Sequence, residues 1–160
     1  MKNYFRKVAF GISPNDEVPA DPLNWALNQV DEIPDLSWKG KIYSEKELRK
    51  HYRDWVYGDR KVLRKKYKDN KTLYKTNKDI LRHKTGQKFW ESLEISIRHN
   101  EGINSSHPVL AKLWMFWGNF FAISEKDFLA NYSTGPYQRE IIRPNLNQSF
   151  EKMVYDVTTS

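Results

Sequence analysis

The chain has 160 residues, which is enough for one domain that buries roughly 70% of its unfolded-chain surface. Aromatic residues make up 14% of the sequence, too many for a disordered tail, and the absence of cysteine excludes disulfides and thiolate metal sites. The net charge of +7 is unevenly spread, because residues 39–88 contain 18 Lys and Arg against 6 Asp and Glu, and 18 minus 6 gives +12. A local basic excess of this size favours anionic partners.

The organisation of the chain is simple. No internal repeat or low-complexity linker divides it, so residues 1–160 predict a single helical domain or the N-terminal segment of a larger one. Within it, a basic helical segment spans 39–88 and a motif-rich segment spans 107–160. No run of 18 apolar residues is present, so no membrane span is expected. Residues 1–14 lack the apolar region and cleavage site of a signal peptide, so we expect a cytoplasmic protein.

The first elements are short. The first sixteen residues predict a helix or turn that ends at Gly11 and Pro14. Asp21 followed by Pro22 predicts a helix start, because Asp can cap the helix and Pro suits its first position, where no N–H partner is needed. This helix is expected to run to about Val30.

The basic segment predicts two or three helices. After a connector over 33–41, Ser44-Glu45-Lys46-Glu47 has the form of a capping box. Apolar residues then recur at helical spacing through the basic segment. A single uninterrupted helix would be unusually long, so Gly58, Asn70 and Gly86 are expected interruptions.

Helical patterns continue to the end of the chain. One helix is expected over 87–99, stopping at Gly102, and another over 108–123. The centre of the second, 113–121, is apolar on all sides, which predicts a helix buried on every face. Two short helices over 124–131 and 136–142, separated by a turn at 133–135, and a last helix over 147–157 complete the chain. With no strand-like alternation, the fold class is all-α: an irregular multi-helix bundle with long basic helices, expected to be an incomplete part of a larger helical fold.

Motifs of known chemistry are missing. The sequence contains no phosphate-binding glycine loop and no G-x-S-x-G elbow, and its four histidines match no metal-ligand spacing. We therefore expect neither a metal nor a cofactor. A group of serines, His99 and Glu101 lies around one helix end, where capping alone explains serines.

The basic segment provides one candidate site. Its lysines and arginines would form a positive stripe able to bind nucleic acid or another polyanion weakly through counterion release. The alternative is a solvated helix face whose aliphatic stems cover apolar surface. The candidate polyanion-binding residues are Lys61, Arg64, Lys65, Lys66, Lys68 and Lys71.

A second candidate site is polar and lies within or just after the apolar helix. Burial there would require hydrogen-bond or charge partners. The candidate residues are Asn119, Arg139, Glu140 and Arg143. The alternative is a structural ion pair of an arginine with Glu140 that fixes the turn at Pro136 against the helix of Trp117.

The C-terminal third carries two motifs that together suggest a family. Phe116-Trp117-Gly118-Asn119-Phe120-Phe121 is followed by Gly135-Pro136-Tyr137-Gln138-Arg139-Glu140 and Ile141-Ile142-Arg143-Pro144, and Ser149-Phe150-Glu151-Lys152-Met153 comes next. Near the start, Arg6 to Gly11 and Pro22-Leu23-Asn24-Trp25 fit the same pattern. In these elements the chain resembles the uncharacterised bacterial family known as domain of unknown function 1800.

The resemblance implies a helical fold of several hundred residues in the full family, with some members exported and many encoded beside another uncharacterised family. It implies no demonstrated reaction. The chain departs from the pattern at Gly118, Phe120 and Asn145, where the family often has histidine. These departures argue against a polar or metal-dependent site built from those histidines.

Three hypotheses about function follow. In the first, the chain is an interaction or assembly module without activity of its own, or a fragment of a longer protein, with self-association or a missing C-terminal segment covering its apolar surface. In the second, it binds nucleic acid or another polyanion through residues 39–88. In the third, it is the N-terminal part of an enzyme whose catalytic groups lie beyond residue 160. The first hypothesis is favoured, because the sequence has an aromatic core, helix caps and a basic face but no visible catalytic constellation.

Overall fold

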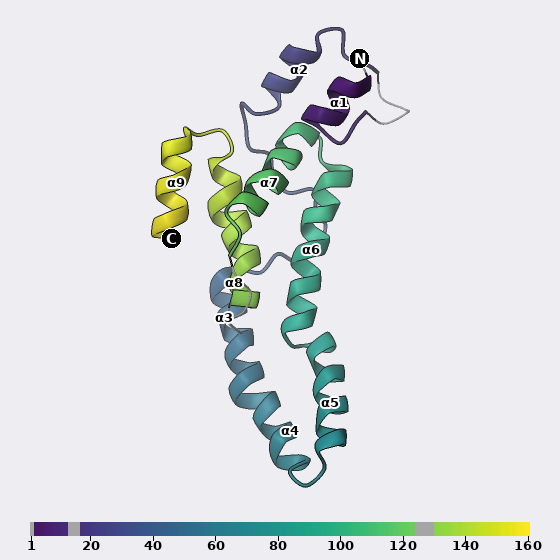
Figure 1. The fold of residues 1–160 in the computed structure, drawn as a ribbon, viewed down its shortest axis with the longest axis vertical. Helices are drawn as coiled ribbons and strands as arrows, with labels where there is room; N and C mark the ends of the chain where they lie inside the picture. Colours follow the sequence, from purple (N-terminus) through teal and green to yellow (C-terminus); the bar gives the residue numbers. More distant parts are fainter. Residues whose placement is uncertain (1, 13–16, 124–129) are drawn as a thin grey trace. The chain divides into compact units, whose positions relative to one another are not determined.

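The computed structural model describes residues 2–12, 17–123 and 130–160, and every regular element in these ranges is a helix (Figure 1). The prediction of an all-α fold is confirmed for the described chain. The expected end of the first helix at Pro14 and most of the helix expected over 124–131 lie outside the described residues.

The chain divides into two compact units, each made of separate segments. The first unit comprises Met1–Gly40, Ile97–Ala122 and Tyr137–Ser160, and the second comprises Lys41–Ser96 and Ile123–Pro136.

The first unit is built around a core of Leu110, Trp114, Ile142, Leu146 and Met153. These side chains come from distant parts of the sequence, so the core joins the middle of the chain to its C-terminal end. The helices of the unit are α1 (Lys2–Val8), α2 (Pro22–Asn28), the later part of α6 (Gln87–Asn104), α7 (Pro108–Phe120), the π-helical η2 (Tyr137–Ile142), the 3₁₀ turn η3 (Arg143–Asn145) and α9 (Phe150–Thr159).

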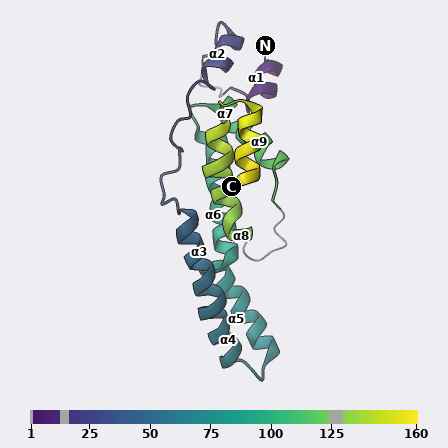
Figure 2. The same ribbon diagram turned by 90° about the vertical axis from the view of Figure 1, so that its left-hand side faces the viewer.

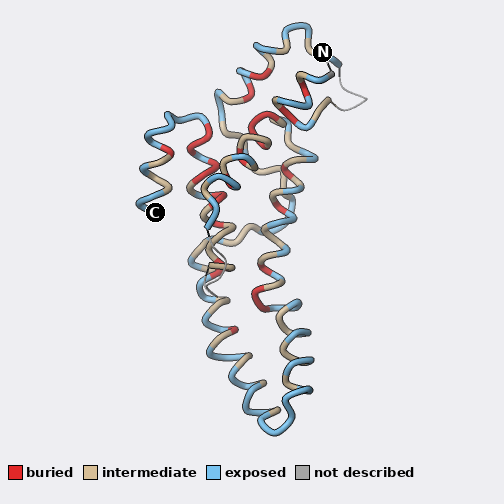
Figure 3. Tube along the Cα trace, viewed as in Figure 1, coloured by how far each residue is buried: buried red, intermediate tan, exposed pale blue. Residues whose placement is uncertain are grey.

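The second unit contains the basic segment. Its helices are α3 (Glu45–Arg53), the π-helical η1 (Asp54–Asp59), α4 (Arg60–Lys66), α5 (Lys71–Lys84), the beginning of α6 and α8 (Ala130–Pro136). Helices α3, η1 and α4 follow one another without a break, and the chain then turns so that α5 runs back beside α4 (Figures 1 and 2). Leu48, Trp90 and Tyr132 form its core, whereas no residue of α4 or α5 is fully buried (Figure 3).

The helix starts follow the local signals in the sequence. Asp21 Oδ1 accepts hydrogen bonds from the backbone N–H groups of Leu23 and Asn24 at 3.1 and 3.0 Å, with Pro22 at the first helical position. Both halves of the capping box at Ser44 and Glu47 are present. These two helix starts are therefore confirmed.

The expected interruptions are only partly correct. Asn70 caps α5, and Gly86 lies between α5 and α6, as predicted. The prediction was wrong for three other glycines, which were expected to end or separate helices. They lie inside helices instead: Gly58 in η1, Gly102 in α6 and Gly135 in α8. A single glycine costs a helix only about 1 kcal/mol, which tertiary packing easily offsets.

The prediction that 113–121 is buried on every face is also wrong. Trp114 is buried, but Phe116 and Phe120 are exposed and Leu113 and Trp117 are half-buried. The neighbouring elements cover one side of α7, whereas periodicity alone cannot say how many partners a helix has.

The capping box at the start of α3 predicts a pH dependence. Lys41, followed by the Ser44 backbone N–H, stabilises the Glu47 carboxylate and lowers the pKa of Glu47 from its ordinary value of 4.5 to about 2. Because the folded-state pKa is depressed, the stabilisation is fully present above pH 4.5 and is lost as the pH falls through about 2. Carboxyl chemical shifts followed during an acid titration should show this midpoint, and Lys41→Ala should raise it. A midpoint near 4.5 in the unaltered chain would contradict the capping geometry.

Candidate functional site

The four polar candidates do not form one site. Asn119 and Glu140 are exposed, whereas Arg139 and Arg143 are buried. Nη1 of Arg139 lies 3.5 Å from Oε1 of Glu140, its neighbour in sequence, so part of the expected structural ion pair is formed. Arg143 does not join this pair, because its partners lie elsewhere in the first unit.

Arg143 belongs to a buried cluster around Glu101, whose side chain is only 3% exposed. Oε2 of Glu101 accepts hydrogen bonds from the backbone N–H of Ser37 at 2.9 Å and from its hydroxyl at 2.8 Å. The Ser37 hydroxyl oxygen in turn accepts a bond from the Asn100 amide at 2.8 Å. Nη2 of Arg143 lies 3.9 Å from Oε1 of Glu101 and donates to the carbonyl oxygen of Pro34.

The charges of this cluster are structural. Burial lowers the pKa of Arg143, and Glu101 and Asp35 act in the opposite direction. Two hydrogen bonds to Oε2 and the facing guanidinium offset the cost of burying the Glu101 carboxylate. From the sequence alone, Glu101 was grouped only with serines and a histidine near one helix end. Its partner Ser37 is 64 residues away and carries no local signal.

Gln138 links the family motif to α7. The indole Nε1 of Trp114 donates to the backbone oxygen of Gln138 at 2.9 Å, and Arg98 donates to its side-chain oxygen. A Cβ atom at Gly118 would lie 3.0 Å from that same oxygen, so a larger residue would press on the Gln138 amide. Glycine at position 118 thus leaves room for the Gln138 amide.

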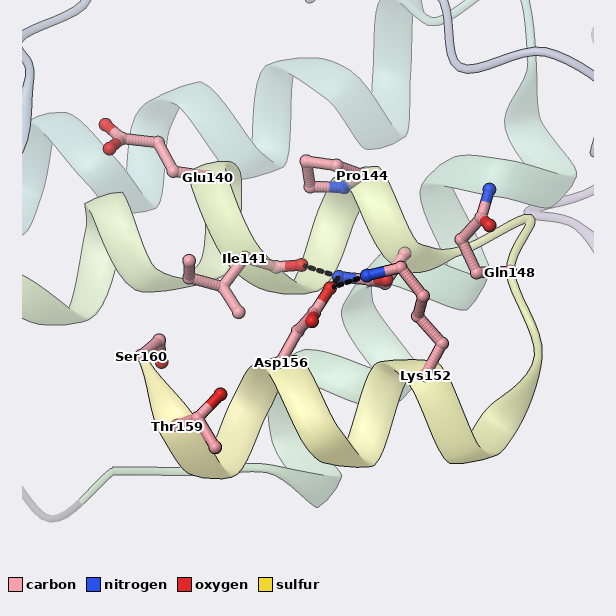
Figure 4. Close-up of a pocket in the computed structure, with 9 residues that line it drawn as sticks. Glu140, Ile141, Pro144, Gln148, Lys152, Asp156, Thr159 and Ser160 are labelled. Atoms are coloured by element: carbon pink, nitrogen blue, oxygen red, sulfur yellow. Dashed lines mark hydrogen bonds and ion pairs between the residues drawn. The ribbon is translucent and has the colours of Figure 1, made fainter.

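A shallow, open hollow of about 430 Å³ lies between η2, η3 and α9 (Figure 4). The Asn145 amide donates to the Ile141 carbonyl at 2.9 Å and to Asp156 at 3.0 Å, and Lys152 donates to Asp156 at 2.6 Å. Lys152 first, and then Asn145, lower the pKa of Asp156, so this carboxylate stays ionised near neutral pH and is not a general acid. The hydrogen bonds along this hollow connect η3 to α9.

The serines and the histidine that follow α6 contact one another within the turn before α7, and none of their side chains caps α7. Ser105 Oγ accepts a bond from the backbone N–H of His107 at 3.1 Å, and the Ser106 hydroxyl lies 2.8 Å from His107 Nδ1. These contacts precede Pro108, the first residue of α7. In the described part of the chain, no group of three or more His, Cys, Asp or Glu residues could hold a metal ion.

The six candidate polyanion-binding residues share one environment. They lie on α4, in the turn after it and at the start of α5, and all six are exposed. Among the described residues, none of the six has a carboxylate within ion-pair distance. Partial burial acts to raise the pKa of Tyr74 on α5, but the guanidinium groups of Arg60 and Arg64 outweigh it and lower that pKa. Tyr74 therefore faces both arginines.

A patch of aromatic rings marks the first unit. The rings of Phe116, Phe120, Phe121 and Phe150 all lie within 5.6 Å, centre to centre, of the Trp117 ring. Phe116, Phe120 and Phe150 are 56%, 63% and 56% exposed. We call these five residues the aromatic face.

These features define the class of protein: an all-α chain with two helical units, one holding a buried charge cluster and the other an exposed basic surface. Residues 4–160 match the family described as protein of unknown function (DUF1800), and the chain belongs to this family. No curated protein and no solved structure matches it. Within the described ranges, every helix is too short or too polar to cross a membrane.

The buried cluster predicts a large cost for losing Arg143. Arg143→Met should lower the free energy of unfolding by about 3–5 kcal/mol, because the Glu101 carboxylate would stay buried without its counter-charge. Arg49→Met is the matched control, since Arg49 lies only 2.6 Å from Glu45 but both side chains are exposed. Its cost should stay below about 1 kcal/mol.

Urea unfolding followed by circular dichroism measures both variants. Equal costs would show that burial does not decide the strength of these pairs, which would contradict the structural role assigned to Glu101.

Proposed function

We propose that this chain is a binding module for nucleic acid. The six candidate cations on α4, in the turn after it and at the start of α5 form the basic surface that would bind the nucleic acid. The observation that carries this proposal is the set of six exposed cations without a carboxylate partner among the described residues. The phosphates of a nucleic acid carry a condensed layer of cations, and exposed lysines and arginines that neutralise the phosphates release these counterions into solution.

The contrast with other cations of the chain supports the proposal. Lys41, Arg49 and Lys152 each lie within 2.7 Å of a carboxylate oxygen. By contrast, α4 and the start of α5 contain only basic charges, and Asp69 lies in the turn between them.

The shape of the hairpin also supports phosphate binding. Helices α4 and α5 lie side by side and are joined by the short turn over 67–70, so the six cations all belong to the same end of this hairpin (Figure 2). Lys66 lies 5.3 Å from the Tyr67 ring and Lys78 lies 5.8 Å from the Tyr74 ring. Both tyrosine rings are half-buried, so they support the cations rather than stand free to stack on bases.

The proposal predicts a steep dependence on salt. If all six cations contact phosphates of a single strand, the logarithm of the binding constant should fall with the logarithm of salt concentration with a slope of about −4. Arg64→Gln combined with Lys65→Gln should weaken binding and reduce the slope by about 1 to 2 units. Arg6→Gln with Lys7→Gln is the matched control, because this exposed pair lies on α1 in the first unit.

Fluorescence anisotropy of a labelled oligonucleotide at several salt concentrations provides the measurement. Absence of binding at low salt, or an equal loss in both double variants, would overturn the proposal.

A second candidate function is assembly, and the aromatic face favours it. Three large rings that are more than half exposed and that all contact the Trp117 ring are typical of interfaces rather than of free surface. We propose a second copy of the chain as the occupant, because an isologous contact would place aromatic rings of one copy on those of the other.

Self-association should therefore depend on the aromatic face. The unaltered chain should show a concentration-dependent mass in sedimentation, and Phe116→Ser with Phe120→Ser should remain a monomer. Leu23→Ser with Ile103→Ser is the matched control, since both residues are exposed in the first unit outside the aromatic face. A chain that is monomeric at all concentrations would contradict this candidate.

A further inference from the structure

Tyr57 has an unusual position on the continuous helix formed by α3, η1 and α4. Its side chain is 69% exposed, and it lines two separate hollows on this helix. One hollow, of about 360 Å³, is lined by Val56, Tyr57, Arg60, Lys61 and Arg64. The other, of about 440 Å³, is lined by Glu45, Lys46, Arg49, Tyr52, Arg53 and Tyr57.

Both hollows combine cations with an aromatic ring. On the α4 side, every lining residue apart from Val56 and Tyr57 is basic. On the α3 side, Glu45 is engaged by Arg49 at 2.6 Å, which leaves Lys46 and Arg53 as cations with no carboxylate partner among the described residues. The ring of Tyr57 thus stands between two groups of positive charge.

The arginines of the α4 hollow lie on one helix face, because Arg60 and Arg64 are four residues apart. Tyr74 on α5 lies close enough to both for their guanidinium groups to lower its pKa.

From this geometry we infer that the surface centred on Tyr57 binds single-stranded nucleic acid, with a base stacked on the Tyr57 ring and the flanking phosphates held by Arg60, Arg64 and Arg53. The inference rests on the proposed function and adds the kind of nucleic acid and the residue that selects it.

The exposed ring favours a single strand. Arg53 and Arg60 lie on either side of Tyr57 in the sequence, immediately before and after η1. In a duplex, the bases are stacked on each other and their faces are not free for a side chain, whereas a single strand offers them to an exposed ring.

The test compares three probes: an oligothymidine, a duplex of the same length, and heparin, which has charge but no bases. Tyr57→Leu should weaken binding of the oligothymidine by about 5- to 150-fold, the equivalent of one lost stacking contact. Binding of the duplex and of heparin should not change. Tyr57→Phe should retain the affinity of the unaltered chain, because it keeps the ring.

The matched control is Tyr155→Leu, since Tyr155 is also 67% exposed but lies on α9 in the first unit. It should change none of the three affinities. Tyr57 is largely exposed, so its replacement should leave the thermal unfolding of the chain unchanged, and a melt of each variant verifies this.

The outcomes separate the inference from the proposed function. If the unaltered chain binds heparin and both nucleic acids in a salt-dependent way but Tyr57→Leu leaves the oligothymidine affinity unchanged, the inference is overturned and the polyanion surface stands. Tighter binding of the duplex than of the single strand would also overturn it. If none of the three probes binds at low salt, the proposed function fails as well.

Discussion

The carboxylate of Glu101 lies inside the first unit, where three segments of the chain contact one another through it. Removing an ion from water costs several kcal/mol, and this cost must be offset by hydrogen bonds and by an opposite charge. Ser37 supplies two hydrogen bonds from the connector, and Arg143 supplies the charge from η3. Arg143 also donates to the Pro34 carbonyl. The connector over 34–37 is not helical, so these backbone groups form their hydrogen bonds with side chains of other elements. The path of residues 34–37 therefore depends on this one buried charge.

The two units treat charge differently. In the first unit, Arg143 and Glu101 are buried and face each other, so each charge is balanced inside the fold by the other. In the second unit, the cations of α4 and of the turn after it are exposed, and Tyr74 is the group that faces Arg60 and Arg64. Aromatic residues do not follow this division, because Trp114 is buried in the first unit and Tyr57 is exposed in the second.

Sequence patterns could predict features set by residues three or four positions apart. The caps at Asp21, Ser44 and Asn70 are of this kind, because the donor and the acceptor lie within one turn. The pairing of Ser37 with Glu101 could not be predicted, since nothing local relates two residues 64 positions apart. The exposure of Phe116 could not be predicted for a related reason. The apolar sequence of α7 indicates that the helix packs against other elements, but it does not give the number of these elements.

The candidate sites show the same limit. The exposure of Lys61, Arg64 and their neighbours agrees with a charged helix face, because long runs of basic residues are rarely buried. Arg139 and Arg143 were grouped by sequence proximity, yet the structure directs Arg143 to Glu101 on another helix. Tyr57 was not singled out at all, because a tyrosine at helical spacing is as typical of a core as of a binding surface. The exposure of Tyr57 and the two cationic hollows beside it are what distinguish a binding surface from a core position.

The arrangement of charge on the hairpin has an energetic consequence. Arg60 and Arg64, Lys61 and Lys65, and Lys71 and Lys75 are like-charged pairs four residues apart on the same helix. Each pair destabilises its helix by about 0.2–0.5 kcal/mol, and the repulsion grows as salt is removed. A bound polyanion would offset these repulsions, because its phosphates attract every cation of the hairpin. The same residues that weaken the free hairpin are thus the ones that would stabilise it when bound.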